Sequence, residues 1–148
     1  LGMIARTFRD HNLYDKAIVF DLTLESAAKM RTLDPKIKIF ISVGEDRFTP
    51  SIYLWGDLVD HEADYDGVWW DEWKTPRSEY TGERAAEIKA KGKLIYAISA
   101  ELHLDHGHPR ALAGYVQDWE AFSRWGVDGV CTAHPRALRE LLERFKVA

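Results

Sequence analysis

The stretch Trp125–Pro135 (WGVDGVCTAHP) constrains the fold of this chain more than any other part of the sequence. Gly126 can adopt the left-handed conformation that ends a helix. The short apolar run that follows predicts a parallel strand buried on both faces. Pro135 suits the first turn of a helix, because its missing N–H has no partner there. The stretch therefore predicts a helix–strand–helix unit. It places residues 132–134 at the carboxyl end of a strand, where α/β folds build their sites.

Composition and charge restrict the class of protein. The 148 residues fit one ordinary domain, 1–148. With 20 basic and 24 acidic residues the formal net charge is −4, and no basic run occurs, which argues against a nucleic-acid partner. No apolar run is long enough for a membrane span. The compartment stays open, with a soluble, cytoplasmic location favoured.

The chain alternates short apolar runs with helical patterns, which predicts an α/β fold with parallel strands and crossover helices. We expect strands at 16–21, 37–43, 67–70, 93–99 and 127–131, and helices at 2–11, 24–34, 81–91, 111–124 and 136–145. The polar stretch 45–66 is long for a connection and predicts a short helix or a functional loop. These strands are too few to close an eight-stranded barrel, which typically needs about 250 residues.

The loop after the strand at 93–99 holds the densest group of chemically active side chains, namely Glu101, His103, Asp105, His106 and His108. Imidazole and carboxylate groups suit Zn²⁺, although the spacing matches no recognised ligand pattern. Three interpretations stay open: a metal site formed by the histidines and Asp105, a loop that contacts a phosphate or leaving group through Glu101 and His103, or a solvated loop. Histidine titrates near neutrality, so His103 could act as a general acid or base.

Other candidates follow the remaining strands. Trp69 and Trp70 should point to opposite faces of their strand. They either pack in the core or form an aromatic wall for a ligand, with Asp71 as its polar anchor. Asp21 and Thr132 either contact a substrate or cap the helices that follow them. The remaining acidic groups near these strands are interpreted as ordinary surface charges: Glu25, Glu72 and Glu83. Cys131, the single cysteine, is interpreted as a small buried hydrophobic residue rather than a catalytic thiol.

The pattern Gly-Val-Asp-Gly, two apolar residues, Thr-x-x-Pro at 126–135 resembles the final strand of the glycerophosphodiester phosphodiesterase family. Glu101-Leu102-His103 is similar to a Pro-Glu-Leu-His loop in phosphodiesterases of the wider phosphatidylinositol-phospholipase-C-like group. Residues 19–35 and 91–93 are similar to earlier segments of the same barrel. Two residues depart from the pattern: Ala133 stands where the family has Asp, and Ala100 stands where the loop has Pro.

The resemblance implies a partial TIM (β/α) barrel that holds parallel strands four to eight of the family fold. It implies a hydrolase of lipid metabolism that splits a small glycerophosphodiester substrate into an alcohol and glycerol phosphate with a divalent metal, Mg²⁺ or Ca²⁺. The implied site residues are Glu101 and His103 as catalytic groups and Asp21, Trp69, Trp70, Asp71 and Thr132 as substrate contacts. The family's His-Arg-Gly motif does not occur in the sequence, and no Glu-x-Asp strand precedes Lys16, so we expect this C-terminal portion alone to be inactive.

Half a barrel leaves an open sheet edge, which invites association with another strand. We expect a homodimer or an N-terminal segment outside this sequence to cover it. Two alternatives to the hydrolase remain. One is a non-enzymatic binding or assembly module built on a half barrel, and the other is a small metal-dependent enzyme centred on the His-rich loop 101–108.

Overall fold

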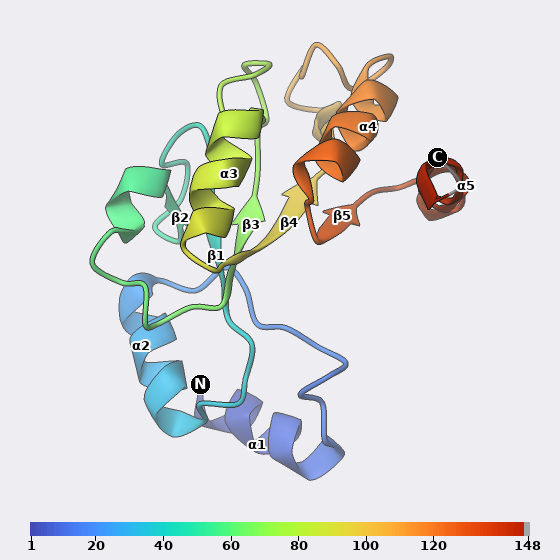
Figure 1. The fold of residues 1–148 in the computed structure, drawn as a ribbon. Helices are drawn as coiled ribbons and strands as arrows, with labels where there is room; N and C mark the ends of the chain where they lie inside the picture. Colours follow the sequence, from blue (N-terminus) through green and yellow to red (C-terminus); the bar gives the residue numbers. More distant parts are fainter. Residues whose placement is uncertain (147–148) are drawn as a thin grey trace. The chain divides into compact units, whose positions relative to one another are not determined.

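A computed structural model describes residues 1–146 of the chain. Its contacts divide the chain into two compact units, Leu1–Trp69 and the residues from Trp70 onward. The strands form a five-stranded parallel sheet with the order β2-β1-β3-β4-β5, which confirms the α/β class (Figure 1).

In chain order the elements are α1 (Gly2–His11), α2 (Leu24–Leu33), β1 (Phe40–Val43), β2 (Ile52–Tyr53), the 3-10 helix η1 (Trp55–Leu58), β3 (Gly67–Trp70), α3 (Gly82–Ala90), β4 (Leu94–Ile98), the 3-10 helix η2 (Ala100–His103), α4 (Tyr115–Trp125), β5 (Gly129–Cys131) and α5 (Pro135–Lys146).

In the first unit, α1 and α2 form where the sequence predicts helices. The end of α1 is set by Asn12, which takes a left-handed conformation with φ of 48°. The start of α2 is capped by the Thr23 side chain, which accepts a hydrogen bond from the Ser26 backbone N–H at 3.2 Å. Strand β1 is buried along its whole length and pairs with β2 in parallel. The hydrophobic run at 37–43 thus forms the centre of this unit.

The predicted strand at Lys16–Asp21 is wrong: the structure has a single parallel bridge there, between Val19 and Ile39. The run starts as a turn, because the backbone N–H groups of Lys16 and Ala17 both donate to the Leu13 carbonyl. It ends at Asp21, whose φ of 60° breaks the extended conformation. Only the middle of the run can therefore join the sheet, and β2, within the polar stretch 45–66, supplies the fifth strand.

Tyr65 gives the first unit a predicted alkaline sensitivity. Its side chain is buried, and burial, with a smaller contribution from the charge of Glu62, raises the pKa of its phenol to about 12. Above pH 10 the unfolded chain releases this proton while the folded chain keeps it, so stability should fall as pH rises from about 10 to about 12. The loss approaches about 1.4 kcal/mol per pH unit in this window. Urea unfolding of the wild type and Tyr65→Phe at several pH values should show a shallower slope in the variant, and equal slopes would contradict the assignment.

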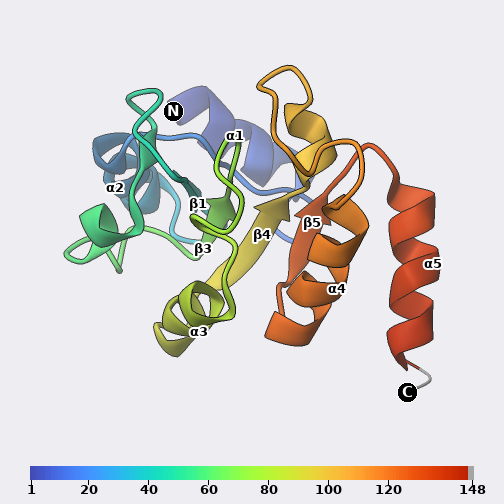
Figure 2. The same cartoon turned by 90° about the horizontal axis from the view of Figure 1, so that it is seen from above.

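The second unit is layered, with helices along one side of its strands. Helices α3 and α4 lie on the same side of β4 and β5, and α5 lies beside α4 (Figure 2). Strands β4 and β5 pair in parallel, with Ile98 opposite Cys131. The ends of both strands therefore reach the same edge of the sheet.

Aromatic rings fill the core of the second unit. Tyr80 packs edge-on against Trp70 and Phe122, with ring centroids 5.0 Å apart in both pairs. Its hydroxyl donates to the Ile98 carbonyl at 2.6 Å, which satisfies the last carbonyl of β4. Burial raises the pKa of this phenol well above its usual value, so Tyr80 remains a hydrogen-bond donor through the physiological range. The same contacts anchor the loop after β3 to the end of β4.

Residues 125–135 have the predicted order of elements: the end of a helix, a strand and the start of a helix. Gly126 ends α4 with φ of 69°, and Pro135 begins α5. One prediction is wrong: β5 is half-buried rather than buried on both faces, because it stands at one end of the strand order. The helix predicted from 111 also begins later, at Tyr115, because residues before Gly114 form hydrogen-bonded turns.

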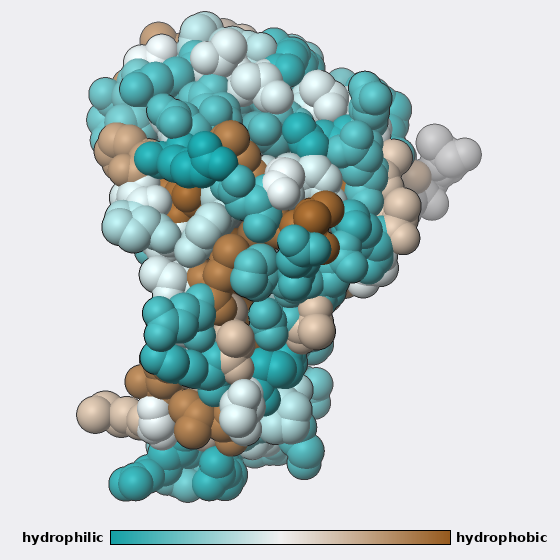
Figure 3. Space-filling model, turned by 90° about the vertical axis from the view of Figure 1, so that its left-hand side faces the viewer, coloured by the Kyte–Doolittle hydropathy of each residue, from teal (hydrophilic) through white to brown (hydrophobic). Residues whose placement is uncertain are grey.

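The molecular surface shows no broad apolar area on the face that Figure 3 presents, where hydrophobic residues form separate patches between hydrophilic ones. None of the helices within residues 1–146 is long and apolar enough to cross a membrane.

Candidate functional site

Side chains that the sequence analysis assigned to three separate strands meet at the carboxyl edge of the second unit. Asp71 directly follows β3, Glu101 and His103 lie in η2 directly after β4, and Thr132 follows β5. Because parallel strands end at the same edge of a sheet, these side chains gather there. Their contacts define the candidate site.

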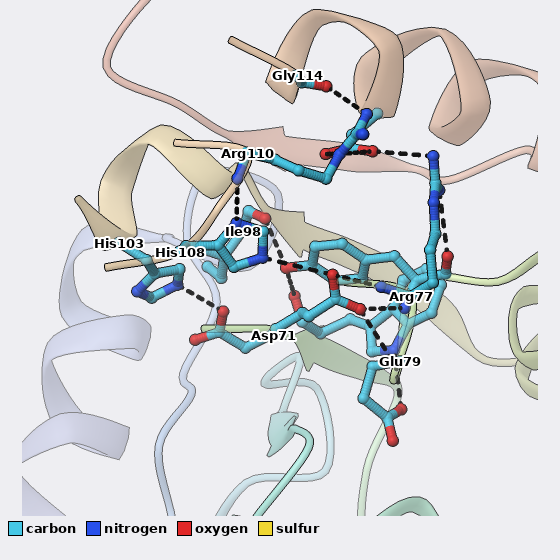
Figure 4. Close-up of polar contacts among 12 residues, drawn as sticks. Asp71, Arg77, Glu79, Ile98, His103, His108, Arg110 and Gly114 are labelled. Carbon is cyan, nitrogen blue, oxygen red and sulfur yellow. Dashed lines mark hydrogen bonds and ion pairs between the residues drawn. The ribbon is translucent and has the colours of Figure 1, made fainter. Parts of the chain in front are cut away.

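His103 and Asp71 form the central pair of this site. The His103 Nε2 atom lies 2.6 Å from Asp71 Oδ1, and only 12% and 18% of the two side chains are exposed (Figure 4). On the other side of the ring, His103 Nδ1 lies 3.2 Å from His106 Nδ1, and the two rings stack with centroids 5.4 Å apart. A carboxylate accepts only, so the proton between His103 and Asp71 belongs to Nε2. The Nδ1 atom of His103 is therefore the one that can exchange a proton or bind a ligand.

Glu101 links the ends of β4 and β5. One of its carboxylate oxygens accepts from the Thr132 hydroxyl and from the Ala133 backbone N–H. The other accepts from the Ser99 hydroxyl, which itself accepts from Trp119 Nε1 at 2.6 Å. Both oxygens are engaged by the chain itself, so these contacts give Glu101 a positioning role. Its catalytic role stays a prediction.

His108 lies apart from the other histidines of its loop, because it is buried. Its Nδ1 accepts from the Arg110 backbone N–H at 3.1 Å, which leaves the ring proton on Nε2. Nε2 lies 3.4 Å from Glu72 Oε1, in a pair whose side chains are 0% and 1% exposed. The prediction of His108 as a metal ligand is therefore wrong: its nitrogen atoms face the interior of the protein and not His103, Asp105 or His106.

Glu72 is buried, and its interpretation as a surface charge is wrong. Its carboxylate accepts from the backbone N–H groups of Arg77, Glu79 and Tyr80 at 2.9–3.0 Å. It thereby holds the whole loop after β3 in one conformation. The signal for this role is in the sequence: in an extended chain Glu72 shares a face with Trp70, and that face is buried.

A buried ion pair fixes the second loop of the site. Asp118 in α4 is 1% exposed, and Arg110 Nε lies 2.9 and 3.0 Å from its two oxygens. Arg110 also donates to the Gly114 carbonyl, and Arg77 lies 3.2 Å from Asp118 (Figure 4). Arg77 therefore ties the loop after β3 to the same carboxylate. Sequence reasoning found none of these contacts, because the partners come from different elements.

Trp69 and Trp70 do not form one aromatic surface that could contact a ligand. Trp70 is fully buried against Tyr80 and donates to Glu79, so its predicted role as a substrate contact is wrong. Trp69 is half-buried and stacks on Phe20 at 4.3 Å, within the first unit. The opposite orientations expected for the two tryptophans explain this difference.

Asp21 is exposed, lies in the first unit, and accepts a hydrogen bond from the Ser51 hydroxyl at 2.6 Å. It does not cap α2, because Thr23 does so. Its predicted contact with a substrate stays a prediction.

The donor set of the site does not fit the Mg²⁺ or Ca²⁺ that the resemblance implies. These ions take about six or more oxygen ligands. The oxygens of Glu101 are already occupied by donors of the chain, and Asp71 is paired with His103. Within residues 1–146, no group of three or more His, Cys, Asp or Glu side chains is placed to hold a metal ion.

Cys131 is half-buried at the end of β5. Burial first, and the nearby charges of Glu101 and Asp71 second, raise the pKa of its thiol. The thiol is therefore protonated at neutral pH and a poor nucleophile. This favours the interpretation of Cys131 as a packing residue over a catalytic one.

Comparisons with protein-family models, with curated proteins and with solved structures found no match to this chain.

Proposed function

We propose that this chain is the substrate-side portion of a phosphodiesterase-like TIM barrel, in which β3, β4 and β5 correspond to later strands of the barrel. The reaction of the complete site is hydrolysis of a glycerophosphodiester to an alcohol and glycerol phosphate. The observation that carries the proposal is the His103–Asp71 pair at the carboxyl edge of the parallel sheet. The motif resemblance at 101–103 and 126–135 supports the same assignment.

Cleavage of a phosphodiester requires a proton for the leaving oxygen and a base for the attacking water. His103 is suited to this work because Asp71 holds its Nε2–H and so fixes the orientation and tautomer of the ring. Proton transfer would then take place at His103 Nδ1. The carboxylate of Asp71 also stabilises the imidazolium that forms when Nδ1 takes up a proton.

Glu101 and Thr132 support this pair as positioning residues. Their hydrogen bond, together with the one from Ala133 N–H, fixes the end of β5 beside η2. Since η2 carries His103, the same contacts hold the histidine at the edge where a substrate would enter. A shift of about 1 Å in such a group is costly for catalysis.

The sequence lacks the family's His-Arg-Gly motif and has no Glu-x-Asp strand before Lys16, and the carboxylates of the site do not fit a hard cation. We therefore expect this chain to bind a glycerophosphodiester without hydrolysing it.

Calorimetric titration with glycerophosphocholine in EDTA tests the binding part of the proposal. The wild type should bind, and His103→Ala should weaken binding by about tenfold or more, because one charge-assisted contact is lost. His61→Ala, in the first unit, is the matched control and should bind like the wild type. Lack of binding by the wild type, or equal affinity in His103→Ala, would contradict the proposal.

Phosphorus NMR of the same mixtures, with Mg²⁺, Ca²⁺, Mn²⁺ or Zn²⁺ supplied in place of EDTA, tests the second part. We expect no glycerol phosphate with any metal. Turnover that disappears in His103→Ala would show that the chain holds a complete catalytic site, and the assignment as a substrate-side portion would then be wrong.

A second candidate function is a non-enzymatic assembly module. It is favoured by β5, which is half-buried and stands at one end of the strand order, where a strand of a second copy could pair with it. Sedimentation analysis distinguishes the two functions. A stable dimer that does not bind glycerophosphocholine favours assembly, whereas a monomer that binds it favours the phosphodiesterase-like site.

A further inference from the structure

His103, the last residue of η2, and His106, in the turn that follows, present their Nδ1 atoms to each other. The distance between His103 Nδ1 and His106 Nδ1 is 3.2 Å. Two imidazole nitrogens bound to one tetrahedral Zn²⁺, at about 2.0–2.1 Å each, lie about 3.3 Å apart. The separation in the structure is thus the separation that one metal ion requires of two ligands.

The second ring nitrogen of His103, Nε2, has the kind of partner that metal-binding histidines have in proteins. Histidine ligands commonly donate their second N–H to a carboxylate, which fixes the tautomer and raises the basicity of the other nitrogen. His103 Nε2 has such a partner in Asp71 Oδ1 at 2.6 Å. The lone pair of His103 is therefore directed from Nδ1 toward His106 in the neutral state. In its Nε2–H tautomer, His106 also presents a lone pair at Nδ1.

We propose that His103 and His106 together bind one transition-metal ion of the Zn²⁺ class through their Nδ1 atoms. Water completes the coordination, as expected for an open site. The Asp105 carboxylate lies 3.8 Å from His106 Nδ1 and is 78% exposed, so the proposed ligands from the chain are the two imidazoles alone. Imidazole donors favour Zn²⁺, Cu²⁺ and Ni²⁺ over Mg²⁺ and Ca²⁺.

This site differs from the metal centre that the phosphodiesterase resemblance implies, which uses a Glu-x-Asp strand that does not occur before Lys16 here. It also goes beyond the proposed function. The metal ion would occupy the same Nδ1 atom that exchanges protons, so metal binding and proton transfer at His103 exclude each other. The proposal depends on the geometry of the loop and remains valid if the chain binds no phosphodiester.

Calorimetric titration of the tag-free chain with zinc chloride, at about pH 7.5 where imidazole is mostly neutral, tests the proposal directly. We expect one ion per chain. His103→Ala and His106→Ala should each weaken binding by at least about tenfold, and Asp71→Asn should weaken it by about tenfold through the loss of the carboxylate behind His103. His11→Ala, an exposed histidine in α1, is the control and should leave zinc affinity unchanged.

A second measurement uses the wild type alone, so its result does not depend on whether the variants fold. Long-range proton–nitrogen NMR spectra should show the Nδ1 resonances of His103 and His106 shifting together on addition of zinc. Zinc affinity unchanged in His106→Ala, or Nδ1 resonances that do not move, would overturn the proposal. Because zinc is titrated without phosphodiester and glycerophosphocholine is titrated in EDTA, failure of one proposal is distinguishable from failure of the other.

Discussion

Replacing Glu72 by alanine is expected to destabilise the fold by about 3–5 kcal/mol, the range for removing one partner of a buried charged group. The Glu72 side chain is 1% exposed and accepts three backbone hydrogen bonds from the loop after β3. Its loss leaves these three donors without their acceptor in the protein interior, and it removes the carboxylate that lies 3.4 Å from His108 Nε2. Each buried donor without an acceptor costs about 1–3 kcal/mol.

Urea unfolding followed by far-ultraviolet circular dichroism measures this loss. Glu143→Ala is a suitable control, because Glu143 is exposed on α5, and it should change the free energy of unfolding by at most about 0.5 kcal/mol. The loss in free energy of unfolding for Glu72→Gln should lie between those of Glu72→Ala and Glu143→Ala. The glutamine keeps one acceptor oxygen, but its amide nitrogen would face a backbone donor. A loss of less than about 1 kcal/mol in Glu72→Ala would show that the carboxylate is not the centre of the loop.

Trp119→Ala is the second substitution with a large expected effect, about 3–5 kcal/mol of lost stability. Trp119 is 1% exposed and packs within α4 against Tyr115. Its indole N–H donates to the Ser99 hydroxyl, which in turn donates to Glu101. The substitution therefore removes a large core side chain and the support of the Glu101 carboxylate at the same time.

Trp119→Phe separates these two contributions, because phenylalanine retains most of the packing and lacks the N–H. We expect it to cost about 1 kcal/mol for the hydrogen bond, plus a smaller amount for the change of shape. Thermal and urea unfolding of both variants provide the comparison. Equal losses in the two variants would mean that the hydrogen bond to Ser99, rather than the buried volume, dominates.

Local signals in the sequence predicted most of the elements, because each of them acts within a few residues. Gly126 and Pro135 bound β5 as expected, and Thr23 and Thr81 cap the helices that follow them. The strand predicted at 16–21 failed because its pairing depends on the distant residue Ile39 and on the conformation of Asp21. A local pattern of apolar residues predicts neither the pairing with Ile39 nor the backbone conformation of Asp21.

The sequence predicted that the residues of the candidate site follow the ends of strands. It did not predict which of their side chains contact each other. Asp71 and His103 were assigned to separate clusters, because they are 32 positions apart and their sequence neighbourhoods give no sign of the pairing. The buried role of Glu72 was missed because charged residues are usually exposed, and three backbone N–H groups compensate for its burial here. Loop conformation, set by these long-range contacts, decides which of the polar side chains meet.

The central claim is that Asp71, Glu101, His103 and Thr132 belong to one phosphodiester-binding site. Titration of the nitrogen-15-labelled chain with glycerophosphocholine in EDTA, followed by amide NMR spectra, tests it most directly. The account predicts that the amide signals of Asp71, of residues 101–103 and of residues 132–134 shift together along one binding curve. Shifts confined to other parts of the chain, or none at all, would contradict it.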